Sequence, residues 1–139
     1  MSKIQGQATS CANSIGQVAS IEALVGDQSA VDQMIIVFKK RRDYMIKLLN
    51  DLPEVKCLVP GGAFYAFPDF GYYMGKSFDG KIIKDSFDLC EIFLNEAYVA
   101  TIPGDGVGAP GYVRFSFAID EKTIKEGIDR VKKIIQQIT

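Results

Sequence analysis

The segment 111–118, Gly-Tyr-Val-Arg-Phe-Ser-Phe-Ala, limits the possible folds more than any other part of the chain. Alternate side chains of a β-strand point to opposite faces of a sheet, so Val113, Phe115 and Phe117 are expected to share one buried face. Arg114 then lies on the other face, with small side chains beside it. The chain must therefore fold so that one face of a sheet is packed and the other leaves room for a guanidinium group.

Arg114 has two interpretations at this point. Its planar fork of N–H donors suits a carboxylate, which it can bind through two parallel hydrogen bonds, and such a pair strengthens where water is excluded. The alternative is a structural ion pair with an Asp or Glu, or an arginine that reaches solvent from an edge strand. The pattern alone favours the structural interpretation, because charges in strands mark binding sites only some of the time.

Length and charge exclude several classes of function. A chain of 139 residues is expected to form one domain with its own core. A formal net charge of −1 and a pI near 5.4 give no reason to expect binding to nucleic acid or to an anionic membrane. The longest uninterrupted apolar run, about 34–38, is far shorter than a membrane span, and the first residues do not resemble a signal peptide.

The cysteines and histidines bear on redox state and catalysis. Cys11, Cys57 and Cys90 are odd in number and far apart, which predicts reduced thiols in a cytoplasmic protein rather than a disulfide framework. The chain contains no histidine, which excludes Ser-His and Cys-His nucleophile pairs and most zinc sites. We therefore predict no metal site.

Helices are expected in the first half of the chain. Residues 1–12 are polar and weakly periodic, as in a connecting segment, whereas apolar spacing over 13–25 predicts a helix with Gly26 as its C-cap. Ser29 can cap a second helix, which Pro53 ends. The buried side of that second helix is expected to consist of Met34, Phe38, Met45, Leu48, Leu49 and Leu52.

Strands and a loop are expected next. Residues 55–59 and 63–67 are predicted to be two strands joined by the turn Pro60-Gly-Gly, and the second is apolar on both faces, which favours an interior position. Tyr65 in that strand is either a core residue or a hydroxyl presented to a ligand. Residues 68–81 are rich in Gly and Tyr without a period, which predicts a long surface loop.

The last part of the chain completes the pattern. A helix over 86–96 is predicted to lead into a strand at 98–102, and a final helix is capped by Asp120. The buried face of the final helix is expected to contain Ile124, Ile128, Val131, Ile135 and Ile138. The order of elements predicts the α/β (α+β) class, as an open-faced sandwich in which helices cover one side of a short, mainly antiparallel sheet.

Two features suggest phosphate binding but have simpler explanations. The basic run 39–42 lies inside a predicted helix without interleaved aromatic residues, so it is interpreted as a solvated face. Gly104, Gly106 and Gly108 alternate in a loop, but a phosphate-binding loop needs a helix N-terminus after it, and here the strand with Arg114 follows.

Five sequence blocks stand out by their order and spacing: Met1–Ser10, Phe38–Asp43, Pro60–Pro68, Val99–Gly104 and Ala109–Ala118. Together they resemble the C-terminal part of the class I aminotransferases, and most of all the bacterial aspartate aminotransferases. These enzymes have the fold type I of pyridoxal-phosphate (PLP) enzymes, and the resemblance covers essentially the whole chain. The fold that the resemblance implies is the C-terminal, or small, domain of that fold type.

The resemblance reverses the preference for Arg114. In that family the arginine of the corresponding block binds the α-carboxylate of the amino-acid substrate, so Arg114 is expected to be the substrate-binding residue here. The resemblance further implies that 1–12 connects to a missing large domain and that 13–139 is the small domain, which closes the active site. The domain alone is then expected to be inactive.

The resemblance also implies what lies outside this chain. The Schiff-base lysine of the family precedes the first block, and the neighbours of Lys3 match the segment after the cofactor site, so no catalytic lysine and no cofactor-binding residue is assigned here. PLP is expected to be bound mainly by the large domain. The parent is expected to be a cytoplasmic homodimer that acts on an amino acid and a 2-oxo acid, with 5–10 lining the neighbouring subunit's site.

The resemblance leaves some points open. Asp105-Gly-Val-Gly108 stands where relatives have a small polar residue, a small residue, Phe and Gly, so an aromatic that helps to close the site is absent. The alternatives to an aminotransferase domain are a non-catalytic carboxylate-binding module and the same domain from another PLP enzyme, a lyase or decarboxylase. The sequence does not identify the amino donor.

Overall fold

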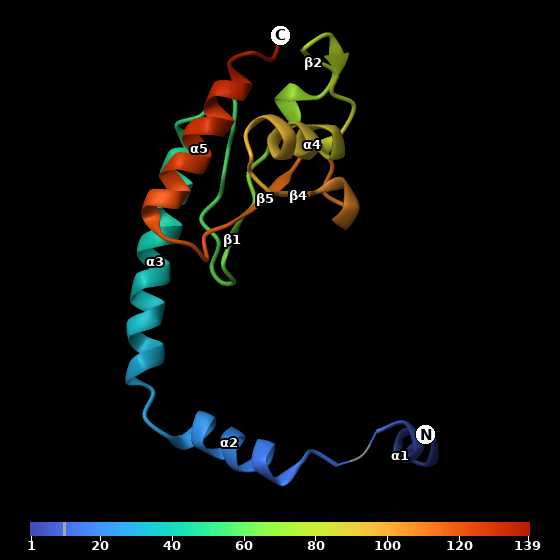
Figure 1. The fold of residues 1–139 in the computed structure, drawn as a ribbon, viewed down its shortest axis with the longest axis vertical. Coiled ribbons are helices and arrows are strands. Elements are labelled where there is room, and N and C mark those ends of the chain that lie inside the picture. Colours follow the sequence, from blue (N-terminus) through green and yellow to red (C-terminus); the bar gives the residue numbers. More distant parts are fainter. Residues whose placement is uncertain (10) are drawn as a thin grey trace. The chain divides into compact units, whose positions relative to one another are not determined.

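The computed structural model describes residues 1–9 and 11–139, and these form two compact units, Met1–Met34 and Ile35–Thr139. The first unit contains α1 (Ser2–Ala8), α2 (Ser14–Val25) and the start of α3 (Ser29–Asn50). All other elements belong to the second unit (Figure 1). Among the described residues, none of the helices combines the length and apolar character needed to cross a bilayer.

The first unit differs from the prediction at its start. The segment that looked like an irregular connection is helical in α1, and the backbone N–H of Thr9 ends this helix by donating to the carbonyl of Gln5 (2.9 Å). α2 follows the prediction closely. The side chain of Asn13 caps it by accepting from the N–H of Gly16 (2.7 Å), and Gly26 is its C-cap.

The third helix begins where the sequence predicts, but the hydrogen bonds at its N-terminus differ from the prediction. Asp27 accepts hydrogen bonds from the N–H (3.0 Å) and the hydroxyl (2.6 Å) of Ser29, so Ser29 is a donor to Asp27 rather than the cap that the sequence predicted. Met34, predicted to be buried, is 55% exposed, whereas Met45 and Leu49 are in the core. Only the C-terminal part of α3 is packed, so the apolar stripe overestimates its buried length.

A three-stranded antiparallel sheet lies at the centre of the second unit. Its order is β1 (Tyr65–Ala66), β5 (Val113–Ser116) and β4 (Ile102–Pro103). β1 is therefore an edge strand and not the interior strand that the sequence predicted. Apolar residues on both of its faces misled the prediction. The chain after β1 stays beside β5, since the N–H of Val113 donates to the carbonyl of Pro68 (3.1 Å) and Asp69 bridges Tyr112, but among the described residues no second strand pairs with β1.

Two other predicted strands are shorter than expected. The segment 55–59 makes only a single bridge, between Lys56 and Asp69. The predicted strand 98–102 is reduced to β4, because the residues before it close the C-terminus of α4 (Ser86–Glu96). There the N–H of Val99 donates to the carbonyl of Phe93 (2.9 Å), and Tyr98 has a left-handed φ of 55°.

The predicted loop 68–81 has more structure than expected. It contains the short 3-10 helix η1 (Gly71–Tyr73) and leads into a hairpin of β2 (Ser77–Phe78) and β3 (Lys81–Ile82). The two connecting residues, Asp79 and Gly80, have φ values of 48° and 77°, as a type I′ turn requires. An Asp-Gly pair between two short strand-like segments is a known hairpin signal, so this hairpin was predictable from the sequence.

The core lies between the sheet and the helices. α4 has the predicted bounds, and α5 (Glu121–Ile135) begins after Asp120, whose side chain accepts from the N–H of Thr123 (3.0 Å). The C-terminal part of α3 and α5 both contribute buried residues to this core, and their ribbons overlap in the view of Figure 1. The central core residues, each at most 3% exposed, include Met45, Leu49, Phe70, Phe93, Val113, Phe115, Phe117, Ile124, Ile128 and Val131. The predicted α/β sandwich is confirmed.

The core predicts the effect of one substitution in α4. Phe93→Ala should lower the free energy of unfolding by about 3–5 kcal/mol, because Phe93 is fully buried and its removal leaves a cavity. Phe87→Ala is the matched control, since Phe87 is on the same helix but 53% exposed, and it should cost less than about 1 kcal/mol. Urea unfolding followed by circular dichroism measures both, and equal losses would contradict this packing of α4.

Candidate functional site

Arg114 lies in β5, the central strand of the sheet. Val113, Phe115 and Phe117 are at most 3% exposed, and Arg114 is half-buried on the opposite face, as the alternation predicts. Pairing with β4 places Arg114 opposite Ile102. The strand therefore fixes the backbone of Arg114 through neighbours on both sides and leaves its side chain on the face away from the core.

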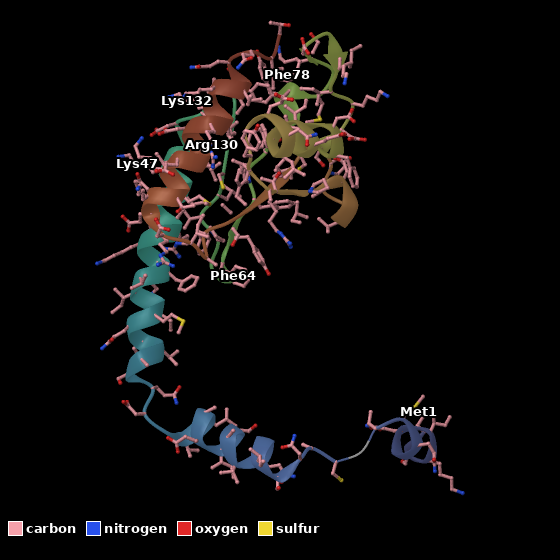
Figure 2. All side chains as sticks on the ribbon, in the orientation of Figure 1. Met1, Lys47, Phe64, Phe78, Arg130 and Lys132 are labelled. Atoms are coloured by element: carbon pink, nitrogen blue, oxygen red, sulfur yellow. The ribbon has the colours of Figure 1, made fainter. Side chains whose placement is uncertain are left out.

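The side chain of Arg114 is stacked on an aromatic ring. Its guanidinium carbon lies 4.5 Å from the centroid of the Tyr65 ring, and Tyr65 belongs to the neighbouring strand β1. Phe64, which Figure 2 labels, packs against Tyr65 in turn, with ring centroids 4.6 Å apart. A cation over a ring face is attracted by the ring quadrupole, and the contact orients the guanidinium plane. The sequence analysis did not identify this role for Tyr65, which only the strand register reveals.

The polar atoms of Arg114 are available to a ligand. Within the part of the chain that the structure describes, Arg114 forms neither a salt bridge nor a hydrogen bond through its side chain. The structural ion pair considered from the sequence is therefore not found among residues 1–9 and 11–139. A half-buried guanidinium fork, oriented by a ring and next to the small side chain of Ser116, can bind a carboxylate through two parallel hydrogen bonds.

A loop between β4 and β5 leads into the Arg114 strand. It contains the short 3-10 helix η2 (Asp105–Val107), and β5 follows as predicted, so the glycines do not open a helix N-terminus. Val107, at the position of the absent aromatic, is 64% exposed. Asp105 turns inward, and the hydrogen bonds from the hydroxyl and then the N–H of Ser86 lower the pKa of its carboxyl. In the sequence, Asp105 stands out only as a departure from the family's pattern, and no local signal indicates its contact with Ser86.

The titratable groups of the described residues do not form a metal site. No group of three or more Cys, Asp or Glu side chains there could hold a metal ion. Cys57 and Cys90 are buried, and burial raises the pKa of both thiols, so neither is an activated nucleophile. Lys3 and the predicted segment 5–10 belong to the other unit, and Ser10 is outside the described residues.

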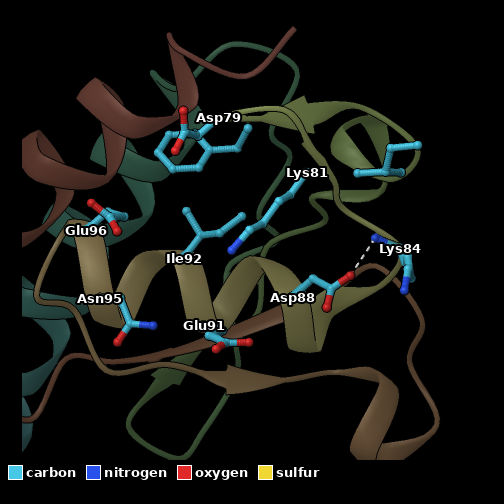
Figure 3. A pocket seen from close by; sticks show the side chains of 10 residues that line it. Asp79, Lys81, Lys84, Asp88, Glu91, Ile92, Asn95 and Glu96 are labelled. Atoms are coloured by element: carbon cyan, nitrogen blue, oxygen red, sulfur yellow. Dashed lines mark hydrogen bonds between the residues drawn. The ribbon is translucent and has the colours of Figure 1, made fainter.

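One surface hollow, of about 530 Å³, lies between the β2–β3 hairpin and α4 (Figure 3). Lys81 reaches over α4 there, and the N–H of Lys84 donates to Asp88 (2.8 Å). Arg114 does not line this hollow. The charged residues that do line it, Glu91 among them, are mostly exposed to solvent. We therefore do not assign it as the site.

A second hollow, of about 210 Å³, lies between α3 and the turn 60–63. Arg42 lines it, but its guanidinium already donates to the carbonyl of Pro60 (3.3 Å) and pairs with Asp43 (2.8 Å). Within the basic run 39–42, Arg41 and Arg42 are half-buried, whereas Lys39 and Lys40 are exposed. The solvated face predicted for the run is therefore limited to the two lysines. Arg114 remains the candidate site residue.

Comparison with known proteins identifies similar chains. The profile of the family described as aminotransferase class I and II matches residues 1–131. The chain is 38% identical over 134 residues to an aspartate aminotransferase of Streptomyces avermitilis. The matched region covers 96% of this chain and 33% of that protein. It is 39% identical over 132 residues to an aspartate aminotransferase of Rhizobium meliloti, and this match covers 94% of this chain and 32% of that protein. The chain thus spans about a third of the length of these curated relatives.

Solved structures show the same fold. A crystal structure of the aspartate aminotransferase from Rhizobium meliloti matches with a TM-score of 0.92 and 37% identity, over 98% of this chain and 34% of that one. The aspartate aminotransferase from Thermus thermophilus with maleate matches with a TM-score of 0.80 and 28% identity, over 95% of this chain and 32% of that one.

The burial of the thiols predicts their reactivity. At pH 8, Ellman's reagent should modify one thiol per chain quickly, because Cys11 is exposed, whereas Cys57 and Cys90 should react only slowly. Their raised pKa keeps the thiolate fraction low, and the core blocks access. Cys11→Ser should remove the fast phase, and 8 M urea should expose the rest. Two fast thiols in the folded chain would contradict the burial described here.

Proposed function

The chain belongs to the aminotransferase class I and II family, and from this premise we propose that it supplies the substrate-binding, site-closing part of a PLP-dependent aminotransferase that acts on aspartate-like substrates. The single observation that supports this most is the free guanidinium fork of Arg114, stacked on Tyr65 and facing away from the core. Its ligand is the α-carboxylate of the amino acid or 2-oxo acid. A related enzyme that binds maleate, a dicarboxylate, is consistent with this chemistry.

Arg114 acts by binding and orientation. Two N–H groups of the fork grip the two carboxylate oxygens, which fixes the position of the neighbouring Cα relative to the rest of the active site. The ring of Tyr65 limits rotation of the guanidinium, so less side-chain entropy is lost when the substrate binds. Closure of the domain over the substrate then excludes water and strengthens the ion pair.

The residues of this chain do not fit the cofactor itself. A lysine that forms a Schiff base is expected in a desolvated pocket, where its pKa is lowered. All the described lysines are exposed except Lys76, which is half-buried with its ammonium 4.5 Å from the Tyr72 ring centroid. The family depends on PLP in general, so we place the cofactor and its lysine in a part of the enzyme outside this chain.

The first unit supports a larger assembly. The apolar side chains of α2 are strongly exposed, and apolar surface of this kind usually marks a protein–protein or domain interface. The exposed residues are Ile15 (82%), Val18 (68%), Ile21 (61%), Leu24 (80%) and Val25 (77%). We propose that the large domain and a second subunit of a homodimer cover them, with Gln5–Thr9 near the partner's site. In this proposal residues 1–12 connect the two domains and 13–139 form the small one.

Substitution of Arg114 tests the proposed site. In the complete enzyme, Arg114→Ala should lower kcat/KM for aspartate by about 30- to 5,000-fold, which corresponds to the loss of about 2–5 kcal/mol for one partner of a buried ion pair. Arg114→Lys should recover only part of this, because an ammonium cannot make the parallel pair of bonds.

The control for this experiment is Arg130→Ala. Arg130 is exposed on α5 and donates only to the carbonyl of Glu126, one turn earlier, so its loss should leave kcat/KM within about twofold. Steady-state kinetics with the three variants decide the point. Normal kinetics in Arg114→Ala would refute the assignment of the carboxylate site.

The absence of a fitting lysine predicts the behaviour of the isolated chain. Purified 139-residue chain mixed with PLP should show no stable aldimine absorption band, and adding aspartate should cause no turnover. A stoichiometric aldimine that converts on addition of aspartate would show that a lysine of this chain is catalytic. Tight aspartate binding without cofactor, measured by calorimetry, would instead favour the alternative of a free-standing carboxylate-binding module.

A further inference from the structure

Ser86, the first residue of α4, is the one polar residue of the described chain that is fully buried (0% exposed). A buried hydroxyl without partners is costly, so its contacts determine what can pack around it. All of them lead to Asp105 in the β4–β5 loop. The Ser86 hydroxyl donates to Oδ2 of Asp105 (2.5 Å) and accepts from the N–H of Asp105 (3.0 Å).

The carboxylate of Asp105 joins three segments of the chain. Its Oδ2 accepts from the N–H of Ser86 (3.0 Å), which is one of the donors left free at the start of α4, and from the N–H of Gly111 (3.3 Å). A negative charge is also favourable at the N-terminus of a helix. Asp105 thus connects α4, its own loop and the residue from which the chain enters β5.

The loop that this carboxylate fills is tightly closed. The N–H of Gly104 donates to the carbonyl of Tyr112 (2.8 Å), and the N–H of Ala109 donates to the carbonyl of Gly104 (2.9 Å). A Cβ added at Gly104 would lie 2.3 Å from the carbonyl oxygen of Ala109, so only glycine fits. Gly111 has φ 78°, and a Cβ there would lie 3.0 Å from Cα of Gly71. This close packing of backbone, together with the three bonds that Asp105 accepts, defines one conformation of the loop.

The pairing of β4 with β5 beside this loop is short, and on its other side β5 pairs with β1. β4 pairs with β5 through only two residue pairs, Ile102 with Arg114 and Pro103 with Val113. Short ladders specify register weakly, so the geometry of the connecting loop contributes to the placement of β4 against β5. The side chain of Arg114 has no hydrogen bond of its own to the described residues. Its position therefore depends on the backbone of β5 and on the ring of Tyr65.

We propose that Asp105, through its bonds to Ser86 and Gly111, is a positioning residue for Arg114 that holds the guanidinium where it meets the substrate carboxylate. This inference rests on the proposed function. Asp105 does not touch the substrate; it fixes the start of β5, three residues before Arg114. Loss of the carboxylate lets the β4–β5 loop relax and displaces Arg114 relative to its ligand. A displacement of about 1 Å at such a group is enough to cost up to about 100-fold.

A double-mutant cycle distinguishes positioning from general stability. The variants are Asp105→Ala, Arg114→Ala and the double variant in the complete PLP-loaded enzyme, with Asp129→Ala as a surface carboxylate control on α5. The probe is maleate, which presents carboxylates without reacting, and calorimetry measures its Kd. Asp105→Ala should weaken maleate about 10-fold in the presence of Arg114. In the Arg114→Ala background the same change should alter Kd by less than about twofold.

Kinetics provide a second readout. Because Arg114 binds the carboxylate in both ground and transition states, its displacement should raise KM for aspartate more than it lowers kcat. Asp105→Asn retains an oxygen that can accept the same three N–H and O–H donors, so it should recover most of the affinity that Asp105→Ala loses. A purely structural role would lower the melting temperature without this dependence on Arg114.

The outcomes separate the two proposals. If Arg114→Ala leaves the maleate Kd unchanged, the proposed function is wrong. If Arg114→Ala weakens maleate but Asp105→Ala does not, or does so equally with and without Arg114, only the positioning role is overturned. Should Asp105→Ala fail to fold, Ser86→Ala replaces it in the same cycle, because it removes both hydroxyl contacts with Asp105. A loss of maleate affinity in Ser86→Ala that depends on Arg114 then supports the positioning role. A loss that is absent, or equal with and without Arg114, overturns it.

Discussion

The packing of one face of β5 is the constraint on which the rest of the second unit depends. Phe115 contacts Phe70 and Phe93, with ring centroids 6.1 and 6.3 Å apart, and Phe70 and Phe93 lie 5.6 Å from each other. These three rings come from the strand, the segment before η1 and α4, so they connect parts that are distant in sequence. Each edge or offset contact adds about 0.5–1.5 kcal/mol beyond the burial of its area. A strand fixed in this way on one face can expose a charge on the other without losing its place.

The alternation of β5 therefore separates stability from recognition. The residues that stabilise the fold, Val113 and Phe115, are next to Arg114 in sequence but on the opposite face of the sheet. A half-buried arginine is costly unless its polar atoms find partners, and the described residues supply only the face of Tyr65. A site that is electrostatically incomplete in this way is suited to a ligand that completes it. In the proposed function, the free energy gained on binding a carboxylate is large, because the guanidinium is already partly desolvated.

Sequence patterns predicted the helices well and the strands poorly, for physical reasons. The bounds of α4 and the cap of α5 follow from local capping chemistry that is present in the sequence. Strand pairing depends on partners far along the chain, so β1 was placed in the interior of the sheet although it is an edge. The hairpin at Asp79-Gly80 could have been predicted, since that dipeptide favours the positive φ values observed. The exposure of Met34 could not, because its helical spacing is the same as that of buried residues.

The site was predictable in part for the same reasons. The strand pattern predicts the face of Arg114, but its stacking on Tyr65 needs the β1–β5 register, which the sequence alone does not determine. The bonds between Asp105 and Ser86 join residues 19 apart, and each residue alone looked like an ordinary loop or helix-start residue. Burial makes the difference, since a fully buried hydroxyl needs a partner and the loop before β5 supplies it. In our proposal, the position of Arg114 thus depends on polar contacts outside its own site, in the loop that leads into β5.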